Sequence, residues 1–226
     1  MTETAPSPFP TPNLPKPRLR GVSHQWAFFV SLVTGAALVI AAPAGEATLA
    51  CAIYALSVAA LFGASALYHR INWASENARR WMRRLDHSMI FLLIAGTYTP
   101  FAILALNGTI GTVILVAVWT GAAAGIVLKL CWIDAPKWFI ALVYVLLGWV
   151  AVAAFPDLID ELGITATAMV AAGGVLYTIG AVVYAAKRPD PVPTVFGYHE
   201  VFHALVIAAA ALQYAVVAFF VLPGSS

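Results

Sequence analysis

Charged residues are scarce in this chain. Only 10% of the 226 residues are charged and 62% are hydrophobic, whereas an ordinary soluble domain has about 25% and 45–50%. So few charges leave too little polar surface for a water-soluble exterior, which excludes that class. Charge is absent altogether from seven windows, which contain no Asp, Glu, Lys or Arg: residues 25–42, 47–68, 87–106, 109–128, 138–155, 164–186 and 201–222.

These charge-free windows have the length of membrane spans. Each is 18 to 23 residues long, and a helix rising about 1.5 Å per residue then matches a hydrocarbon core about 30 Å thick. The sequence therefore predicts an all-α, polytopic membrane protein with seven transmembrane helices. We expect the helical domain at residues 22–222 and a short tail at 223–226.

The missing charges also exclude several functions of membrane proteins. No lysine lies inside a window, so a retinal Schiff base cannot form there. No carboxylate lies inside one either, which excludes proton pumping through buried carboxylates and gives little support to a channel with a charged selectivity ring. The net charge of +2 gives no indication of nucleic-acid binding, and membrane lipid is the expected partner.

Cysteine is nearly absent, but proline is concentrated at the start. Cys51 and Cys131 are expected near opposite ends of their helices, too far apart for a disulfide. Six prolines fall within residues 1–20, so residues 1–21 are predicted to be a disordered cytoplasmic arm. A cleaved signal peptide is the alternative, although the prolines and the 18-residue first window favour a retained helix.

The basic residues indicate an orientation. Alternating the connections between two sides places all twelve on one side: Lys16, Arg18, Arg20, Arg70, Arg79, Arg80, Arg83, Arg84, Lys129, Lys137, Lys187 and Arg188. The other side receives Glu46, Asp157, Asp160 and Glu161. By the positive-inside rule, the N-terminus is cytoplasmic and the C-terminus lies outside a bacterial inner membrane.

Three histidines are expected to meet at the cytoplasmic side. His69 ends the second predicted helix, and His199 and His203 begin the seventh. His199 and His203 are four residues apart and share a helix face. Ligating residues at membrane depth are costly unless they face a cavity or one another. Three neutral imidazoles suit Zn²⁺ and leave a fourth position open. By contrast, the single His24 is interpreted as an interfacial side chain.

Asp86 and Ser65 are the candidate catalytic residues. Asp86, at the predicted start of the third helix, is placed to accept a proton from a zinc-bound water. Alternatively, it caps that helix and pairs with Arg83 or Arg84. Ser65 lies one turn before His69 and could donate a hydrogen bond to a reacting oxyanion, or could bond its own helix backbone.

Residues His199 to His203 also spell H-E-x-x-H, a zinc-protease pattern in which the glutamate is the general base. Such a protease needs a third ligand downstream, and the last window offers none after His203. Glu200 could equally be an interfacial acid paired with Lys187 or Arg188. Its role is therefore left open.

Other polar and small residues are interpreted as structural. Gly121 and Gly125 permit close helix packing, more within the bundle than between protomers. Gln213 is expected to line the interior of the bundle.

Several strings together resemble a known family. Ser65-x3-His69, Asp86 seventeen positions later and His199-x3-His203 are similar to the signature of the hemolysin III group within the progestin and adipoQ receptor superfamily. The strings at 65–70 (SALYHR), 85–87 (LDH), 94–101 (IAGTYTPF) and 197–200 (GYHE) resemble it closely. The resemblance extends from about Val22 to Leu222.

The resemblance implies a seven-helix fold with an inward N-terminus and zinc ligation by His69, His199 and His203. It also implies that Asp86 lies beside the zinc-bound water and that Ser65 belongs to the wider motif. The superfamily resembles alkaline ceramidases, which implies lipid-amide hydrolysis by analogy. The group is named after a haemolytic phenotype, which does not establish a pore.

The leading hypothesis is therefore a zinc-dependent hydrolase of a lipid amide or ester, with Asp86 as general base. A receptor-like or regulatory membrane protein with structural zinc is the second hypothesis, and a haemolytic pore is the third.

Overall fold

The structure is a computed structural model that describes residues 16–106 and 108–225. Most of the arm predicted at 1–21 therefore lies outside the described residues. Its last part, 16–21, includes a turn whose backbone contacts the loop before the last long helix. Arg18 N donates to Thr194 O at 3.0 Å and Leu19 N to Val195 O at 3.1 Å. This segment precedes the first helix directly.

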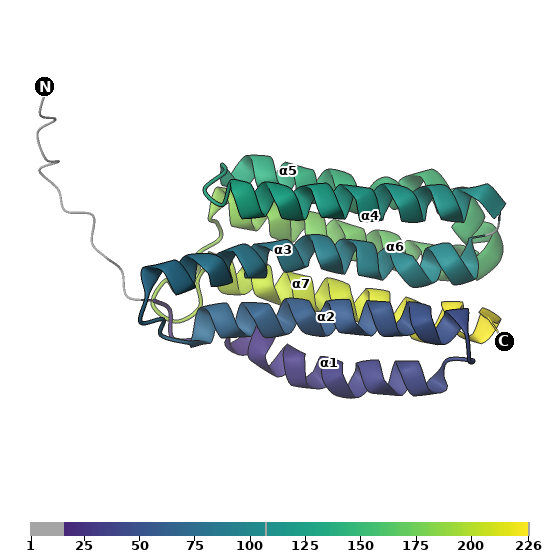
Figure 1. Ribbon diagram of the computed structural model, residues 1–226, viewed down its shortest axis with the longest axis horizontal. Helices are drawn as coiled ribbons and strands as arrows, with labels where there is room; N and C mark the ends of the chain where they lie inside the picture. The colour runs from purple at the N-terminus through teal and green to yellow at the C-terminus, as the bar shows by residue number, and fades with distance from the viewer. Residues whose placement is uncertain (1–15, 107, 226) are drawn as a thin grey trace, which may run out of the picture.

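The described residues form helices and contain no β-strand. The α-helices are α1 (Val22–Ala41), α2 (Glu46–Arg70), α3 (Glu76–Pro100), α4 (Gly108–Cys131), α5 (Lys137–Gly148), α6 (Phe155–Ala186) and α7 (Tyr198–Val216). Figure 1 shows them side by side along the longest axis, with α1 at one edge of the bundle. The expected all-α architecture is confirmed.

Within the described chain, six helical segments are long and apolar enough to cross a membrane. The fifth, Lys137–Ala186, is 50 residues long and contains both α5 and α6, joined by a 3-10 helix at Val150–Ala154. Its backbone leaves the helical region at Gly163, with φ 82° and ψ 164°. In Figure 1, α5 and α6 lie along the same stretch of the bundle, and the two helices contact each other.

The outer surface of the bundle is apolar. Trp26, Ile40, Ile164 and Phe219 have 65%, 84%, 73% and 71% of their side-chain surface exposed. Large apolar side chains are rarely this exposed across a water-soluble monomer. Such a surface is suited to contact with lipid tails, which agrees with the multi-pass membrane protein that the charge-free windows predict.

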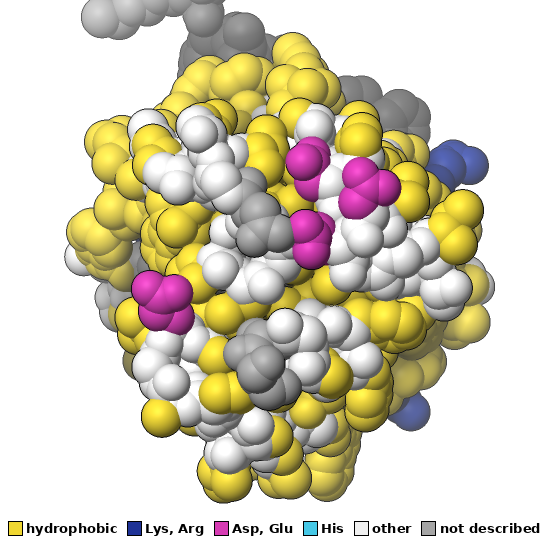
Figure 2. All heavy atoms as spheres, turned by 90° about the vertical axis from the view of Figure 1, so that its right-hand side faces the viewer, with side chains coloured by type: hydrophobic (Ala, Val, Ile, Leu, Met, Phe, Trp, Pro, Cys, Tyr) yellow, Lys and Arg dark blue, Asp and Glu magenta, His cyan; other side chains and the backbone are white. Residues whose placement is uncertain are grey.

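Charge is sorted between the two ends of the bundle. The segment before α1, the end of α2, the first turns of α3 and the start of α5 lie at the left-hand end of Figure 1, and together they carry nine of the twelve basic residues. Figure 2 views the opposite end, where acidic side chains are visible and basic ones appear only at the margin. The segregation of basic from acidic residues that the sequence predicts therefore exists in the fold.

Helix α3 begins earlier than predicted. The sequence placed its start at Asp86, but α3 begins at Glu76, where the Ser75 hydroxyl caps the helix by accepting from Ala78 N. Charge-free windows mark only the part of a helix inside the hydrocarbon, and residues 76–85 are charged but favour helix. Asp86 is therefore in the middle of a helix, so the alternative in which it caps α3 is wrong.

Candidate metal centre

Three histidine side chains from two helices meet inside the bundle. His69 is the last residue but one of α2, while His199 and His203 occupy the first two turns of α7. Their side chains are buried, and one nitrogen from each lies within 4.8 Å of the others. This arrangement can hold a metal ion. The structure thus brings together the three residues that the sequence singled out as ligands.

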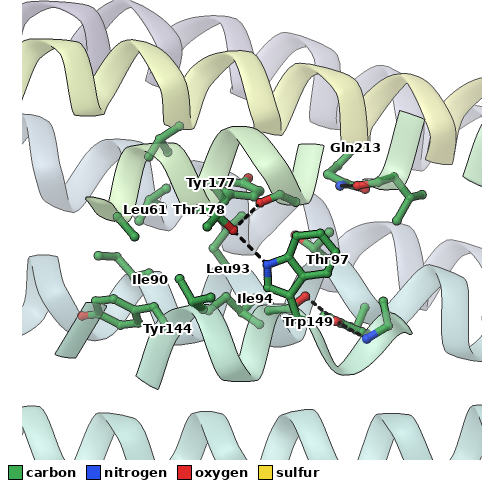
Figure 3. A pocket seen from close by; sticks show the side chains of 18 of the residues that line it. Leu61, Ile90, Leu93, Ile94, Thr97, Tyr144, Trp149, Tyr177, Thr178 and Gln213 are labelled. Carbon is green, nitrogen blue, oxygen red and sulfur yellow. Dashed lines mark hydrogen bonds between the residues drawn. The ribbon is translucent and has the colours of Figure 1, made fainter. Parts of the chain in front are cut away.

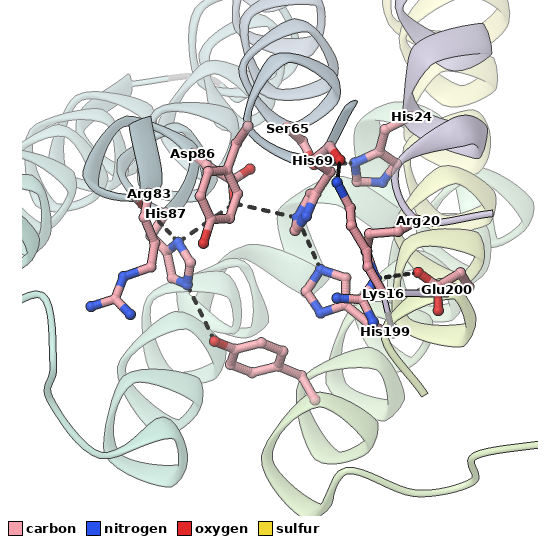
Figure 4. Close-up of polar contacts among 12 residues, drawn as sticks. Lys16, Arg20, His24, Ser65, His69, Arg83, Asp86, His87, His199 and Glu200 are labelled. Carbon is pink, nitrogen blue, oxygen red and sulfur yellow. Dashed lines mark hydrogen bonds and ion pairs between the residues drawn. The ribbon is translucent and has the colours of Figure 1, made fainter. Parts of the chain in front are cut away.

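The nitrogens of this histidine cluster face one another. His69 Nε2 and His199 Nε2 are 3.1 Å apart, and Figure 4 shows the two rings pointing toward each other. Nδ1 of His203 is buried without a hydrogen-bond partner. Buried ring nitrogens normally have partners, so a shared ion is a chemically suitable one. A neutral imidazole offers one lone pair to such an ion.

Asp86 lies beside the histidine cluster. Its Oδ2 atom is 3.8 Å from His69 Nε2 and 3.5 Å from His87 Nδ1, as Figure 4 shows. Arg83 and Arg84 do not pair with it. Arg83 instead hydrogen-bonds Asp134, and Arg84 Nε donates to Leu130 O at 3.0 Å. These arginines therefore do not neutralise Asp86, and the alternative in which they pair with it is wrong.

The Arg83 guanidinium affects a different carboxylate. Its hydrogen bond holds the pKa of Asp134 below the ordinary value, and Asp134 is in the exposed connection between α4 and α5. Asp134 therefore stays charged and keeps Arg83 turned away from the cluster. As a result, Asp86 faces the histidines without a basic partner.

His24 is a residue of the site that the sequence interpretation missed. It was assigned to the membrane interface, but it is 2% exposed, and its Nδ1 is 2.8 Å from Ser65 Oγ. Its ring stacks on that of His203, with centroids 3.7 Å apart and planes at 13°. The interfacial assignment is wrong. Its position directly before the first charge-free window, at the same basic end of the bundle as the other histidines, was the signal available.

Ser65 is held by His24 rather than by its own helix backbone. It is 2% exposed and lines the same cavity as Asp86. Ser65 on α2 therefore bonds to α1 next to the histidine cluster. A hydroxyl so placed can donate to a group bound there.

His87 has a separate set of partners. Its Nδ1 is 2.8 Å from Arg83 O, and its Nε2 is 3.2 Å from the Tyr184 hydroxyl. A carbonyl only accepts, so Nδ1 carries the proton and the Tyr184 hydroxyl donates to Nε2. These bonds orient His87 beside Asp86. No separate role was predicted for either His87 or Tyr184 from the sequence.

Glu200, the acid of the H-E-x-x-H string, is occupied by its neighbours. Arg20 Nε donates to its Oε1 at 2.5 Å, and Gly197 N donates to its Oε2 at 2.9 Å. The carboxylate is 1% exposed and caps the start of α7 by accepting from the backbone of Gly197. Its ion-pair partner is Arg20, not Lys187 or Arg188. Glu200 also does not line the cavity, which disfavours it as the base of a zinc protease.

The segment before α1 also contacts the end of α2. The Lys16 ammonium donates to the backbone oxygen of His69. Burial and the nearby charges of Arg20, Arg70 and Arg79 lower the pKa of Lys16. Lys16 and Arg20 together hold this segment against the same end of the bundle as the histidine cluster, as Figure 4 shows.

A cavity extends from the cluster into the bundle. Its volume is about 160 Å³, whereas a single water needs only about 10–15 Å³. His199, His203, Asp86 and Ser65 line one end. Figure 3 shows the rest of the lining, which is mainly apolar and reaches Trp149 and Gln213. Gln213 lines the interior as predicted.

The chain matches the family model described as Haemolysin-III related over residues 13–214. Hemolysin-3 of Bacillus cereus is 33% identical over 181 residues, which cover 80% of this chain and 79% of that protein. A Hemolysin-3 homolog of Bacillus subtilis (strain 168) is 34% identical over 171 residues, covering 74% and 75%.

A more distant similarity leads to animal proteins. The monocyte to macrophage differentiation factor of Homo sapiens is 24% identical over 165 residues, which cover 72% of this chain and 66% of that protein. This match supports the wider superfamily that the motifs indicate. The chain therefore belongs to the haemolysin-III-related family, within the progestin and adipoQ receptor superfamily.

Proposed function

We propose that this protein is a zinc-dependent hydrolase of a lipid amide or ester. The observation that carries the proposal is the continuity between the histidine cluster and the cavity, because His199, His203, Asp86 and the apolar lining belong to one cavity. A reacting carbonyl could lie at the histidines while its hydrocarbon chain occupies the cavity. A mainly apolar pocket with a few polar groups is the usual form of a small-molecule site.

Zinc is the ion that these ligands favour. His69, His199 and His203 supply three imidazoles, and this donor set with one position left open is typical of catalytic zinc. When bound, zinc polarises a carbonyl oxygen and lowers the pKa of water to about 7.

The protein's own groups would position the substrate and move a proton. Asp86 Oδ2, close to His69 and to His87, would accept the proton from the attacking water. The bond from Tyr184 to His87 would hold the imidazole that faces Asp86. Ser65, kept in place by His24, would donate to the carbonyl oxygen as negative charge develops on it.

The proposal includes seven membrane crossings. As a straight helix, Lys137–Ala186 with its 50 residues would be about 75 Å long, more than twice the hydrocarbon thickness. The break at Gly163 and the side-by-side placement of α5 and α6 in Figure 1 favour two crossings. With α1, α2, α3, α4 and α7 this makes seven.

The proposed orientation follows from the sorted charges. The basic end of the bundle, which contains the histidine cluster, would face the cytoplasm, and the acidic end would face outward. Seven crossings then place the N-terminus inside and the C-terminus outside. The two bacterial relatives support a bacterial cytoplasmic membrane as the location.

The test of hydrolysis is turnover of a panel of lipid amides and esters by the purified protein in lipid nanodiscs. Asp86→Asn should keep the fold and much of the zinc, because the amide has the same size and the three histidines remain. Its turnover should fall by roughly 100-fold, the usual scale for losing a general base.

The matched control is Asp160→Asn, which removes an exposed acid at the opposite end of the bundle and outside the cavity and should leave turnover unchanged. Equal turnover by wild type and Asp86→Asn, at equal zinc content, would refute the role of Asp86. No turnover of any lipid by the wild type would leave the receptor-like role with structural zinc as the better account. The almost complete burial of the three histidines is the observation that favours that role.

A further inference from the structure

The far end of the cavity contains a polar group without a partner. Gln213 on α7 is 5% exposed and lines the cavity, as Figure 3 shows. Its Nε2 donates to Val170 O at 3.1 Å, but its Oε1 is buried and bonded to nothing. Buried polar atoms in folded proteins almost always have a partner. The exception therefore requires an explanation.

The orientation of the Gln213 amide is fixed by its neighbours. A backbone carbonyl only accepts, so the nitrogen must face Val170 and the oxygen is the free acceptor. Gly173 makes room for this arrangement, because a Cβ atom at that position would lie 2.5 Å from Gln213 Nε2. The sequence thus provides both the amide and the space that it occupies.

A second unpaired group lies one helical turn from Gly173. The Tyr177 hydroxyl is buried without a partner, and Tyr177 also lines the cavity. Two neighbouring polar groups of the lining do have partners: Trp149 Nε1 donates to Thr178 Oγ1 at 2.8 Å, and the Tyr98 hydroxyl donates to Gly148 O at 2.7 Å. Polar groups at membrane depth that face a cavity are functional candidates.

The two unpaired groups restrict which chemical group a ligand can place at this end of the cavity. Gln213 Oε1 needs a donor, and the Tyr177 hydroxyl can donate or accept. A methyl group would leave both unsatisfied, a carboxylate has no proton to donate, and an ammonium group would bury an unpaired charge. A neutral hydroxyl meets these requirements.

We propose that the cavity binds an apolar chain with a hydroxyl at its far end, which donates to Gln213 Oε1. Gln213 is ten residues beyond His203 on α7, about 15 Å along the helix axis. This is roughly the length of a twelve-carbon chain whose head group lies at the histidine cluster. The inference rests on the proposed function only for the position of that head group.

The test compares two probes on the full-length protein in lipid nanodiscs. Dodecanoic acid and 12-hydroxydodecanoic acid differ only in the terminal hydroxyl, and each would compete with radiolabelled dodecanoic acid for binding. Wild type should bind the hydroxylated probe about 10-fold more tightly, the scale of one well-placed hydrogen bond. Gln213→Leu should remove this preference.

Tyr54→Phe is the matched control. Tyr54 also has a buried hydroxyl without a partner, but it does not line the cavity, so its loss should leave the preference intact. Equal binding of both probes by wild type, tighter binding of dodecanoic acid, or displacement by neither probe would each overturn the inference. Because binding is measured without turnover, a preference for the hydroxyl would stand even if no lipid were hydrolysed.

Discussion

At the scale of single residues, a change at Glu200 distinguishes a hydrolase that uses Asp86 as its base from a zinc protease that uses Glu200. Both mechanisms would bind zinc through His199 and His203. Both of its oxygens are bonded, one by Arg20 and one by Gly197. Glu200→Gln should therefore lower stability, by about 2 kcal/mol, because Arg20 loses its charged partner but remains partly in contact with water. Turnover should stay within about tenfold of wild type, since Glu200 is not the base.

Thermal unfolding and lipid turnover of the same purified variant check this prediction. The double variant Arg20→Met with Glu200→Gln should be less destabilised than the sum of the single changes, because the two residues interact directly. A 100-fold loss of turnover in Glu200→Gln, at normal stability, would instead favour the zinc-protease mechanism.

The depth at which each residue is expected in the membrane predicted much of the candidate site, but it failed to identify His24. His69, His199 and His203 were brought together by their common position at one end of two windows, and the structure places them within reach of one ion. The same argument applied to His24, but a single histidine has no partner four residues away, so spacing alone did not single it out. Its contact with His203 depends on how α1 packs against α7.

At the scale of helices, Gly125 marks a close packing contact. A Cβ atom there would lie 2.2 Å from Cε1 of Phe91, whose ring is fully buried. Gly125→Ala should therefore destabilise the protein by about 1–3 kcal/mol, the usual cost of overpacking. Because Phe91 belongs to α3, this contact is within the bundle, as the sequence predicts.

Gly148→Ala provides the comparison, because no atom lies within 4 Å of its added Cβ. That change should be neutral or stabilising by up to about 1 kcal/mol. Unfolding midpoints of the two variants, measured in the same detergent, test the difference. Equal midpoints would show that Phe91 does not limit the space at Gly125.

The ends of the helices were harder to predict from the sequence than the presence of each helix. Charge-free windows located the spans, but they missed the ten residues of α3 that precede Asp86, because a helix can continue beyond the hydrocarbon. The break at Gly163 has a left-handed φ that favours glycine. Gly163 lies between the windows 138–155 and 164–186, so the sequence placed it in a connection, but it did not predict that residues 156–162 before it are helical.

At the scale of the whole molecule, the two cysteines are natural reporters of orientation. Cys131 is exposed at the basic end of α4, whereas Cys51 is buried within α2. A membrane-impermeant maleimide should therefore label Cys131 in inside-out vesicles and not in right-side-out vesicles. Cys131→Ser should abolish the signal. Labelling from the outer side would contradict the cytoplasmic placement of the histidine cluster.

The segregation of charge between the two ends could be predicted from the sequence, because it depends only on alternating crossings. The cavity could not, since it depends on where side chains from several helices leave space. Gln213 was expected inside the bundle, but its unpaired oxygen becomes visible only once Val170 and Gly173 are placed beside it.

The most direct test of the central claim is the zinc content of the purified protein. Wild type should contain about one zinc per chain, and His69→Ala and His203→Ala should lose most of it, because two histidines hold the ion poorly. His87→Ala is the matched control, since His87 is buried nearby but lies outside the three-histidine group, and it should retain the zinc. Full zinc retention in both His69→Ala and His203→Ala would contradict the metal centre.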